Sequence, residues 1–144
     1  MPNNPIKTER LIIRRWCAGD RAALGQLLQN PETMAFSLVG VHDDAAIDAW
    51  LVQSQQSHNQ TTDIAGHAQA TGLGHWAIVL ANQSHTNTAA PFGYVKLIEV
   101  PDLTGVHEVE LGIRLLPSGW GQGFAFEACA AVIAQLWATT GKAR

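Results

Sequence analysis

The sequence has few cysteines, few charged residues and no long apolar run. Its two cysteines, Cys17 and Cys129, are too few for a disulfide scaffold in 144 residues, and both are expected to be core thiols. Charged residues make up 15%, the formal net charge is -3 and no basic run occurs, which argues against a nucleic-acid partner bound through its phosphates. With no apolar stretch of membrane length and no charged-then-apolar N-terminus, neither a membrane span nor a secretory signal is predicted. These absences favour a cytoplasmic protein.

Apolar residues are abundant instead. They make up 47% of the chain, which is enough for a substantial core and far from a disordered composition. A length of 144 residues fits one domain, and no repeat or linker divides the chain. We therefore expect residues 1–144 to form a single domain.

The periodicity of the apolar residues predicts the order of strands and helices. Strands are expected at 8–16, 75–81, 92–100 and 107–116, and helices at 18–30, 43–59 and 123–140. A polar segment, 52–74, is expected to fray from the second helix into a loop. The last three strands follow one another through short or polar connections, so they should form an antiparallel meander. The fold class is therefore α+β: a mostly antiparallel sheet with helices on its faces.

Two helical stripes and most of the tryptophans are expected in the core. The stripes are Leu24, Leu27 and Leu28 in the first helix and Ile47, Trp50 and Leu51 in the second. The tryptophans are Trp16, Trp50, Trp76 and Trp137.

The stretch SGWGQGFA, residues 118–125, is a glycine-rich turn between the last strand and the last helix. A helix N-terminus leaves backbone N–H groups unpaired, and its dipole favours an anion there. Gly121 and Gly123 lack a Cβ atom, so a phosphate group can approach the main chain closely. The turn fits neither a dinucleotide-binding fingerprint, which requires glycine at Phe126, nor a Walker A loop, which requires a Gly-Lys-Ser/Thr ending. The glycines predict a phosphate or pyrophosphate site, or a turn that only lets the helix pack tightly on the strand.

Two blocks of the sequence together resemble one family. They are TERLIIRRW, residues 8–16, and ELGIRLLPSGWGQGFAFEACAAVI, residues 110–133. They resemble the GNAT superfamily of N-acetyltransferases, and within it the branch that acetylates ribosomal-protein N-termini. That branch typically carries a TERL-x-L-R strand near its start and later E-L-G-Y, a proline and W-G-x-G-Y-A-x-E-A. The matching residues are Thr8, Glu9, Arg10, Leu11, Arg14, Glu110, Leu111, Gly112, Pro117, Trp120, Gly121, Gly123, Ala125, Glu127 and Ala128, with Phe124 in place of the usual Tyr.

The resemblance implies a GNAT-like fold and a site for acetyl-coenzyme A (acetyl-CoA) as cosubstrate. In the family, amides of the glycine turn bind the pyrophosphate, and the pantetheine arm runs beside the preceding strand. Carried over, the pyrophosphate contacts are Gly121, Gln122, Gly123, Phe124 and Ala125, and the pantetheine side is Ile113, Arg114 and Leu115. The segment that borders the acceptor cleft in the family contains Met34, Phe36 and Trp50 here, for which simple packing is the alternative.

The implied reaction is acetyl transfer to a primary amine, such as a peptide or protein N-terminal α-amine, by direct attack on the thioester. The ammonium must first lose a proton, and Glu110 is the candidate base, directly or through a water. Glu108 shares its face of the strand, lies farther from the turn and ranks second. For both, the alternative is a solvated strand face with an ion pair. Main-chain N–H groups around 111–113 would stabilise the oxyanion.

No residue is predicted to protonate the leaving thiolate or to bind a metal. In the family a Tyr that protonates the thiolate, or an Asn that binds the coenzyme, often follows the fifth strand, and Tyr94, the single tyrosine, matches no such position. The six histidines show no pair at helical spacing with a carboxylate, so no metal site is expected.

The chain stops at Arg144, where the fifth strand of the family would begin. We therefore expect a C-terminally truncated acetyltransferase-like domain that lacks the last strands and one helix of the family. The strand 107–116 would then be an open edge and the apolar last helix would lack cover, so we expect self-association as a dimer through either. The alternative function is a non-catalytic acyl-CoA-binding or scaffold remnant. A nucleotide-binding regulator, based on the glycine turn alone, is a third.

Overall fold

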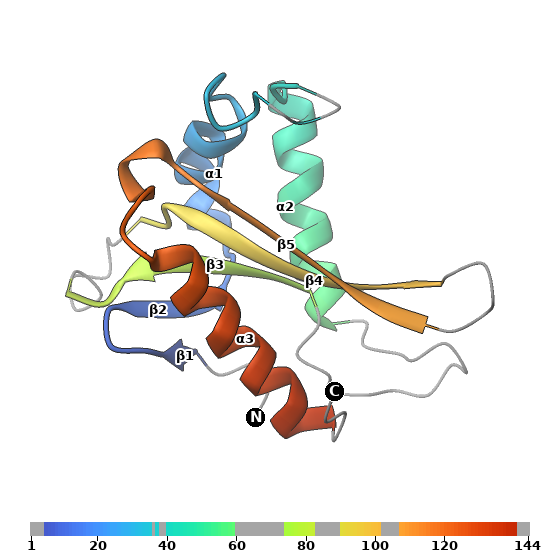
Figure 1. Cartoon of the computed structure of the whole chain (residues 1–144). Helices are drawn as coiled ribbons and strands as arrows, with labels where there is room; N and C mark the ends of the chain where they lie inside the picture. The colour runs from blue at the N-terminus through green and yellow to red at the C-terminus, as the bar shows by residue number, and fades with distance from the viewer. Residues whose placement is uncertain are drawn as a thin grey trace.

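The structure, a computed structural model of the chain, describes residues 5–35, 37, 40–59, 74–82, 90–101 and 107–140. One antiparallel sheet has the strand order β1-β2-β3-β4-β5 (Figure 1). Its strands are β1 (Ile6–Lys7), β2 (Leu11–Arg15), β3 (Gly74–Leu80), β4 (Gly93–Pro101) and β5 (His107–Leu115). The helices are α1 (Arg21–Leu28), α2 (Asp44–Asn59) and α3 (Phe124–Thr140), with 3-10 turns η1 (Ala18–Asp20) and η3 (Pro117–Gly119). The predicted α+β class and the meander of β3, β4 and β5 are confirmed.

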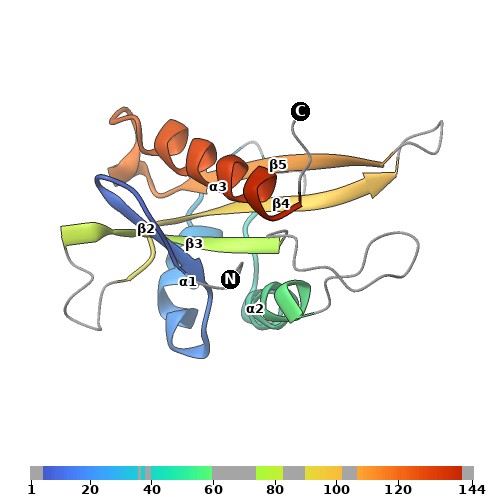
Figure 2. The ribbon, with the colours of Figure 1, turned by 90° about the horizontal axis from the view of Figure 1, so that it is seen from below.

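Helices cover both faces of the sheet. Figure 2 shows α3 on one face and α1 and α2 on the other. Because successive strand residues point to opposite faces, Trp76 and Ile78 join the core beneath α3, whereas Ala77 joins the core beneath α1 and α2. No helix within the described ranges is long and apolar enough to cross a membrane. The predicted helical stripes are confirmed by the burial of Leu24, Leu27, Leu28, Ile47 and Leu51. Trp50, from the second stripe, is half-buried and packs against the same core.

The N-terminal strand differs from its prediction. Residues 8–11 form a tight turn in which the Thr8 N–H donates to the Leu11 carbonyl at 2.9 Å. The expected strand 8–16 is therefore β2 alone, and it pairs with β1 as a hairpin. Sequence periodicity missed β1 because a strand of 2 residues gives no repeating pattern. The helix expected at 18–30 begins as η1 and ends at Leu28.

Two residues expected in the core lie at the surface instead. Cys17 is exposed because it stands where the chain leaves β2 for η1, whereas Cys129 is half-buried and burial raises the pKa of its thiol. Trp137 is 47% exposed because it follows Leu136, which takes the sheet-facing position in that turn of α3. The core predictions for Cys17 and Trp137 are thus wrong. Those for two other tryptophans are confirmed, at Trp16 and Trp76.

An ion pair fixes the start of α1. The buried Asp20 carboxylate accepts hydrogen bonds from Arg14 Nη1 at 2.8 Å, from Arg14 Nη2 at 3.0 Å and from the Cys17 N–H at 2.9 Å. Burial by itself raises the pKa of Asp20, but the hydrogen bonds from Arg14 and Cys17 outweigh it and hold the pKa below its ordinary value. Asp20 is therefore ionised at neutral pH and ties β2 to the helix that follows.

Replacing Asp20 by Asn should lower the free energy of unfolding at pH 7 by about 1–3 kcal/mol, because hydrogen bonds between charged groups are lost. Since the pKa of Asp20 is lowered in the folded state, its stabilisation is present above the ordinary Asp pKa of about 4. It is lost as the pH falls through the lower folded value. Urea unfolding from about pH 6 to pH 2 should show the wild-type and D20N curves converging in acid.

The control for this experiment is Glu9→Gln, which changes an exposed carboxylate between β1 and β2. The stability of this variant should stay close to that of the wild type at neutral pH. If wild type and D20N differ by the same free energy at every pH, the ion pair is not the source of the effect.

Candidate functional site

The glycine turn lies at the surface between η3 and α3. Gly121 and Gly123 have φ angles of +75° and +81°, in the left-handed region that favours glycine. Residues 121–123 are exposed, and α3 begins at Phe124. In the part of the chain that the structure describes, no N–H group of residues 121–125 donates a hydrogen bond. The turn therefore presents unpaired amides at the positive end of a helix of 17 residues, which favours a bound anion.

Two side chains of the turn bind main-chain carbonyl groups nearby. The Trp120 indole N–H donates to the Leu115 carbonyl at 2.9 Å, although the Trp120 side chain is still 48% exposed. Gln122 Nε2 donates to the Ser118 carbonyl at 2.8 Å. The Gln122 side chain thus stabilises the turn, and its backbone amide is the group that remains for a ligand.

The two sequence blocks meet at this turn. The Arg10 N–H and Nε donate to the Glu127 carboxylate at 2.9 and 2.7 Å, and the Thr8 hydroxyl donates to the same carboxylate. Arg10 Nη1 donates to the Gln122 carbonyl at 2.8 Å. The hydrogen bond from Thr8, together with those from Arg10, lowers the pKa of Glu127. The motif match gave these residues no role, because a contact across most of the chain leaves no local pattern.

β5 is an edge strand that pairs with β4 alone among the described strands. The Leu116 N–H donates to the Phe92 carbonyl at 2.8 Å, in register with the β4–β5 ladder. The polar backbone groups of an antiparallel strand alternate in direction. Those of even-numbered residues in 108–116 therefore face β4, and those of odd-numbered residues face outward. The open edge offers the N–H and C=O groups of the odd-numbered residues to a ligand.

This alternation separates the three residues predicted to lie beside pantetheine. Ile113 directs its N–H and C=O groups to the open edge. Leu115 directs its N–H group there, while its carbonyl is taken by the Trp120 indole. The backbone groups of Arg114 face β4. Ile113 and Leu115 can therefore pair with an extended ligand along the edge, whereas the backbone of Arg114 cannot.

The Arg114 side chain connects a loop to the sheet through hydrogen bonds. Its Nε donates to the Tyr94 hydroxyl at 3.1 Å, and its Nη1 donates to the Thr33 carbonyl at 2.7 Å. Both contacts lie on the side of the sheet that α1 and α2 cover, where Tyr94 belongs to the core. These interactions of Arg114 are therefore structural, because they join a loop to Tyr94, which is only 7% exposed.

Glu110 lies on the same face of β5 as Gly112 and is exposed. Within the described ranges its carboxylate has no hydrogen-bond or ion-pair partner, so it is available as a base. Lys96 lies across Gly112, with Cε 2.7 Å from the position that a Cβ atom would occupy there. Because Gly112 has no side chain, the Lys96 side chain can lie across it, on the face of β5 that carries Glu110. Glu108 also belongs to β5, but its side chain lies outside the described part.

The residues predicted to border an acceptor cleft differ in burial. Met34 is only 4% exposed and packs in the core beneath α1 and α2, so packing is its evident role. Trp50 is half-buried and keeps part of its surface accessible. Phe36 lies outside the described residues. The rings that surround Trp50 are Trp16, His75 and Tyr94, with centroid distances of 5.4, 4.8 and 5.1 Å.

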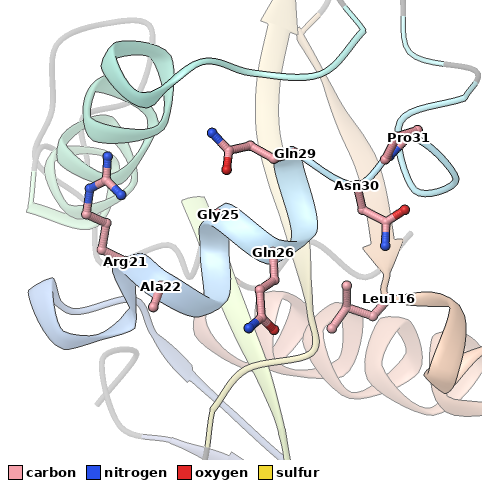
Figure 3. A pocket seen from close by; sticks show the side chains of 8 residues that line it. All are labelled: Arg21, Ala22, Gly25, Gln26, Gln29, Asn30, Pro31 and Leu116. Carbon is pink, nitrogen blue, oxygen red and sulfur yellow. The ribbon is translucent and has the colours of Figure 1, made fainter.

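A hollow of about 600 Å³ lies beside α1. Figure 3 shows Arg21 and Gln26 leaving α1 on different sides, so their polar groups do not converge. Arg21 is already paired with Asp48 at 2.6 Å. The hollow contains none of the predicted site residues and offers no carboxylate or thiol for chemistry. It is lined by Arg21, Ala22, Gly25, Gln26, Gln29, Asn30, Pro31 and Leu116.

The described groups combine an anion site, an open strand edge and a free carboxylate. Unpaired amides at 121–125 can bind a phosphate group, and the edge of β5 can pair with an extended ligand that carries amides. Glu110 can accept a proton. Among the residues that the structure describes, no group of three His, Cys, Asp or Glu side chains could hold a metal ion.

Comparison with known proteins gives a family and a fold. Residues 10–144 match the family described as acetyltransferase (GNAT) domain. The structure resembles a GNAT-family acetyltransferase from Bacillus anthracis with a TM-score of 0.69 and 18% identity, over 94% of this chain and 67% of that one. It also resembles a putative GNAT-family acetyltransferase from Bordetella pertussis with a TM-score of 0.68 and 15% identity, over 96% and 74%. At these identities the two structures support the fold alone.

Proposed function

Because the chain belongs to the acetyltransferase (GNAT) domain family, we propose that it transfers an acetyl group from acetyl-CoA to a primary amine. The observation that carries the proposal is the exposed turn with unpaired amides at the N-terminus of α3, which follows directly on the open edge of β5. Amides of residues 121–125 would hold the pyrophosphate. The Ile113 carbonyl and the Leu115 N–H would pair with the amides of the pantetheine arm.

The reaction would begin with proton transfer from the acceptor ammonium to Glu110, directly or through a water molecule. The free amine would then attack the thioester carbonyl. The outward N–H groups of Leu111 and Ile113 would donate to the oxyanion of the tetrahedral intermediate. Its collapse breaks the C–S bond, and the attacking nitrogen loses its second proton to solvent as the amide forms. The CoA thiolate that leaves takes up a proton from solvent, and Glu110 releases its proton to solvent.

The acceptor class that the resemblance supports is a peptide or protein N-terminal α-amine. The matching blocks resemble those of the branch that acetylates ribosomal-protein N-termini, and Trp50, one of the predicted cleft residues, keeps part of its surface accessible. The roles of Phe36 and Glu108 remain predictions. A non-catalytic acyl-CoA-binding protein is the alternative.

Thiol release and calorimetry test this proposal together. The chain is incubated with acetyl-CoA and peptides that have a free N-terminus, and with the same peptides blocked at the N-terminus. Thiol release that needs the free α-amine would support the proposal. Binding of CoA in the calorimeter without release for any amine would favour the alternative. If neither acetyl-CoA nor CoA binds, both functions are excluded for this chain.

We also propose that the chain self-associates as a dimer. Of the two surfaces predicted for this, the outer face of α3 is the one that we propose, because the β5 edge is the proposed coenzyme site. Two large apolar side chains of α3 are exposed, Phe126 by 69% and Trp137 by 47%. An exposed apolar helix face favours pairing with a second copy, and a two-fold dimer closes it.

Sedimentation at micromolar concentration should therefore show a dimer that Trp137→Lys dissociates. Val52→Lys is the matched control, because Val52 is 51% exposed on α2, in the opposite layer. A stable wild-type monomer with cooperative unfolding would contradict self-association.

A further inference from the structure

Arg10 connects the N-terminal hairpin to the glycine turn. It stands between β1 and β2, and its guanidinium carbon lies 4.4 Å from the centre of the Phe124 ring. Nε binds the Glu127 carboxylate and Nη1 binds the Gln122 carbonyl. Nη2 is 3.4 Å from the position that a Cβ atom would occupy on Gly123. One side chain thus contacts the turn and the first turn of α3 from the same side.

The bond to the Gln122 carbonyl fixes the direction of the next amide. In a trans peptide group, the C=O and N–H bonds point in opposite directions, and no cis peptide bond occurs here. Because the Gln122 carbonyl faces Arg10 at 2.8 Å, the Gly123 N–H faces away from Arg10. Gly123 has positive φ and no side chain, so this peptide group could otherwise reorient at low cost. Arg10 therefore determines where one of the amides of the anion site points.

The hydrogen bonds from Arg10 to Glu127 keep its carboxylate, which could compete with an anionic ligand, away from the anion site. Glu127 lies in the first turn of α3, where a carboxylate can itself occupy the unpaired N–H groups or repel an incoming anion. Its lowered pKa keeps it ionised at neutral pH. Arg10 and Thr8 hold this carboxylate on the side of the N-terminal hairpin, and the positive charge of Arg10 compensates it.

We propose that Arg10 is a positioning residue of the anion site, which orients the Gln122–Gly123 peptide group and keeps the Glu127 carboxylate away from the helix N-terminus. This inference rests on the acetyl-CoA function proposed above and adds a residue that the motif match left without a role. The diphosphate is the part of the ligand that depends on Arg10. The thioester and the pantetheine arm lie along β5 and do not depend on it.

Two probes separate these parts. CoA carries the diphosphate, whereas S-acetylpantetheine carries the thioester and the amides without it. Arg10→Met should raise the Kd for CoA about tenfold, as expected when a hydrogen bond between charged groups no longer orders the site. The Kd for S-acetylpantetheine should change less than about twofold. General damage to the fold would weaken both ligands, so the selective loss distinguishes positioning from stability.

Two further variants sharpen the test. In the double variant R10M/E127Q the uncompensated carboxylate is gone, so part of the lost CoA affinity should return. Arg21→Met breaks an arginine–carboxylate pair between α1 and α2 and should leave the affinity for both probes unchanged. If R10M does not fold, Arg10→Lys makes the same comparison, because Lys keeps the charge but has no fork to bind Glu127 and Gln122 together.

The outcomes distinguish this inference from the function on which it rests. A wild-type chain that binds no CoA overturns the proposed function and this inference with it. If the wild type binds CoA and the folded Arg10 variant binds it as tightly, only the role of Arg10 is overturned. An equal loss of affinity for CoA and S-acetylpantetheine also overturns it, because Arg10 would then support the fold in general.

Discussion

Replacing Glu110 by Gln is expected to lower kcat for acetyl transfer by about 10²- to 10⁴-fold, the usual contribution of a general base. The amide is nearly isosteric with the carboxylate but cannot take a proton from the acceptor ammonium. Because Glu110 is exposed and has no partner within the described residues, the exchange should leave the fold intact. The affinity for CoA should change little, since the turn at 121–125 is untouched.

Steady-state kinetics with the best acceptor found in the thiol-release assay would measure this effect. Glu110→Asp keeps a carboxylate and should retain part of the activity, because the shorter side chain can still act through a water. Glu108→Gln, which changes the second-ranked candidate on β5, is the matched control and should have the smaller effect. Full activity of Glu110→Gln would remove this residue from the mechanism.

Replacing Gly123 by Val should lower the affinity for CoA by about 10- to 100-fold, in line with the loss of hydrogen bonds to a charged phosphate group. Gly123 has a φ of +81°, which a β-branched residue strongly disfavours, so the turn would shift and its amides would lose their common direction. The new side chain would also meet Arg10, whose Nη2 lies 3.4 Å from the Cβ position. Titration calorimetry with CoA measures the loss.

Strain alone must be separated from loss of the anion site. Gly40 has a φ of +67°, and a Cβ atom there would meet nothing within 4 Å. Gly40→Val therefore introduces similar backbone strain outside the glycine turn and should leave the affinity for CoA unchanged. If Gly123→Val folds and binds CoA like the wild type, the turn does not hold the pyrophosphate.

The sequence by itself determined those parts of this protein that depend on local patterns. Apolar residues at helical spacing predicted α1 and α2, and short apolar-rich runs bounded by polar or turn residues predicted β3, β4 and β5, because these patterns reflect burial. Gly121 and Gly123 predicted a turn at a helix N-terminus, which the structure confirms, and their φ angles of +75° and +81° are what the structure adds. The family followed from two motif blocks. All these signals lie within short stretches of the chain.

The local sequence pattern did not predict which residues at the margins of an element are buried. Helical spacing placed Trp137 on an apolar helix, but its exposure depends on which side of α3 the sheet occupies. Met34 follows a proline in a polar stretch, and only the packing of α1 and α2 on the sheet buries it. The hairpin of β1 and β2 was missed for a related reason, since pairing rather than periodicity defines so short a strand.

The tertiary structure alone decided how the site is assembled. The ladder between β4 and β5 determines which backbone groups of β5 face outward, so it separates Ile113 and Leu115 from Arg114. Folding brings Arg10, from the first sequence block, into contact with Gln122 and Glu127, from the second. A sequence pattern records which face of an element is apolar, but it does not record which distant element meets that face. For that physical reason the glycine turn could be predicted from the sequence, and the arginine that orients it could not.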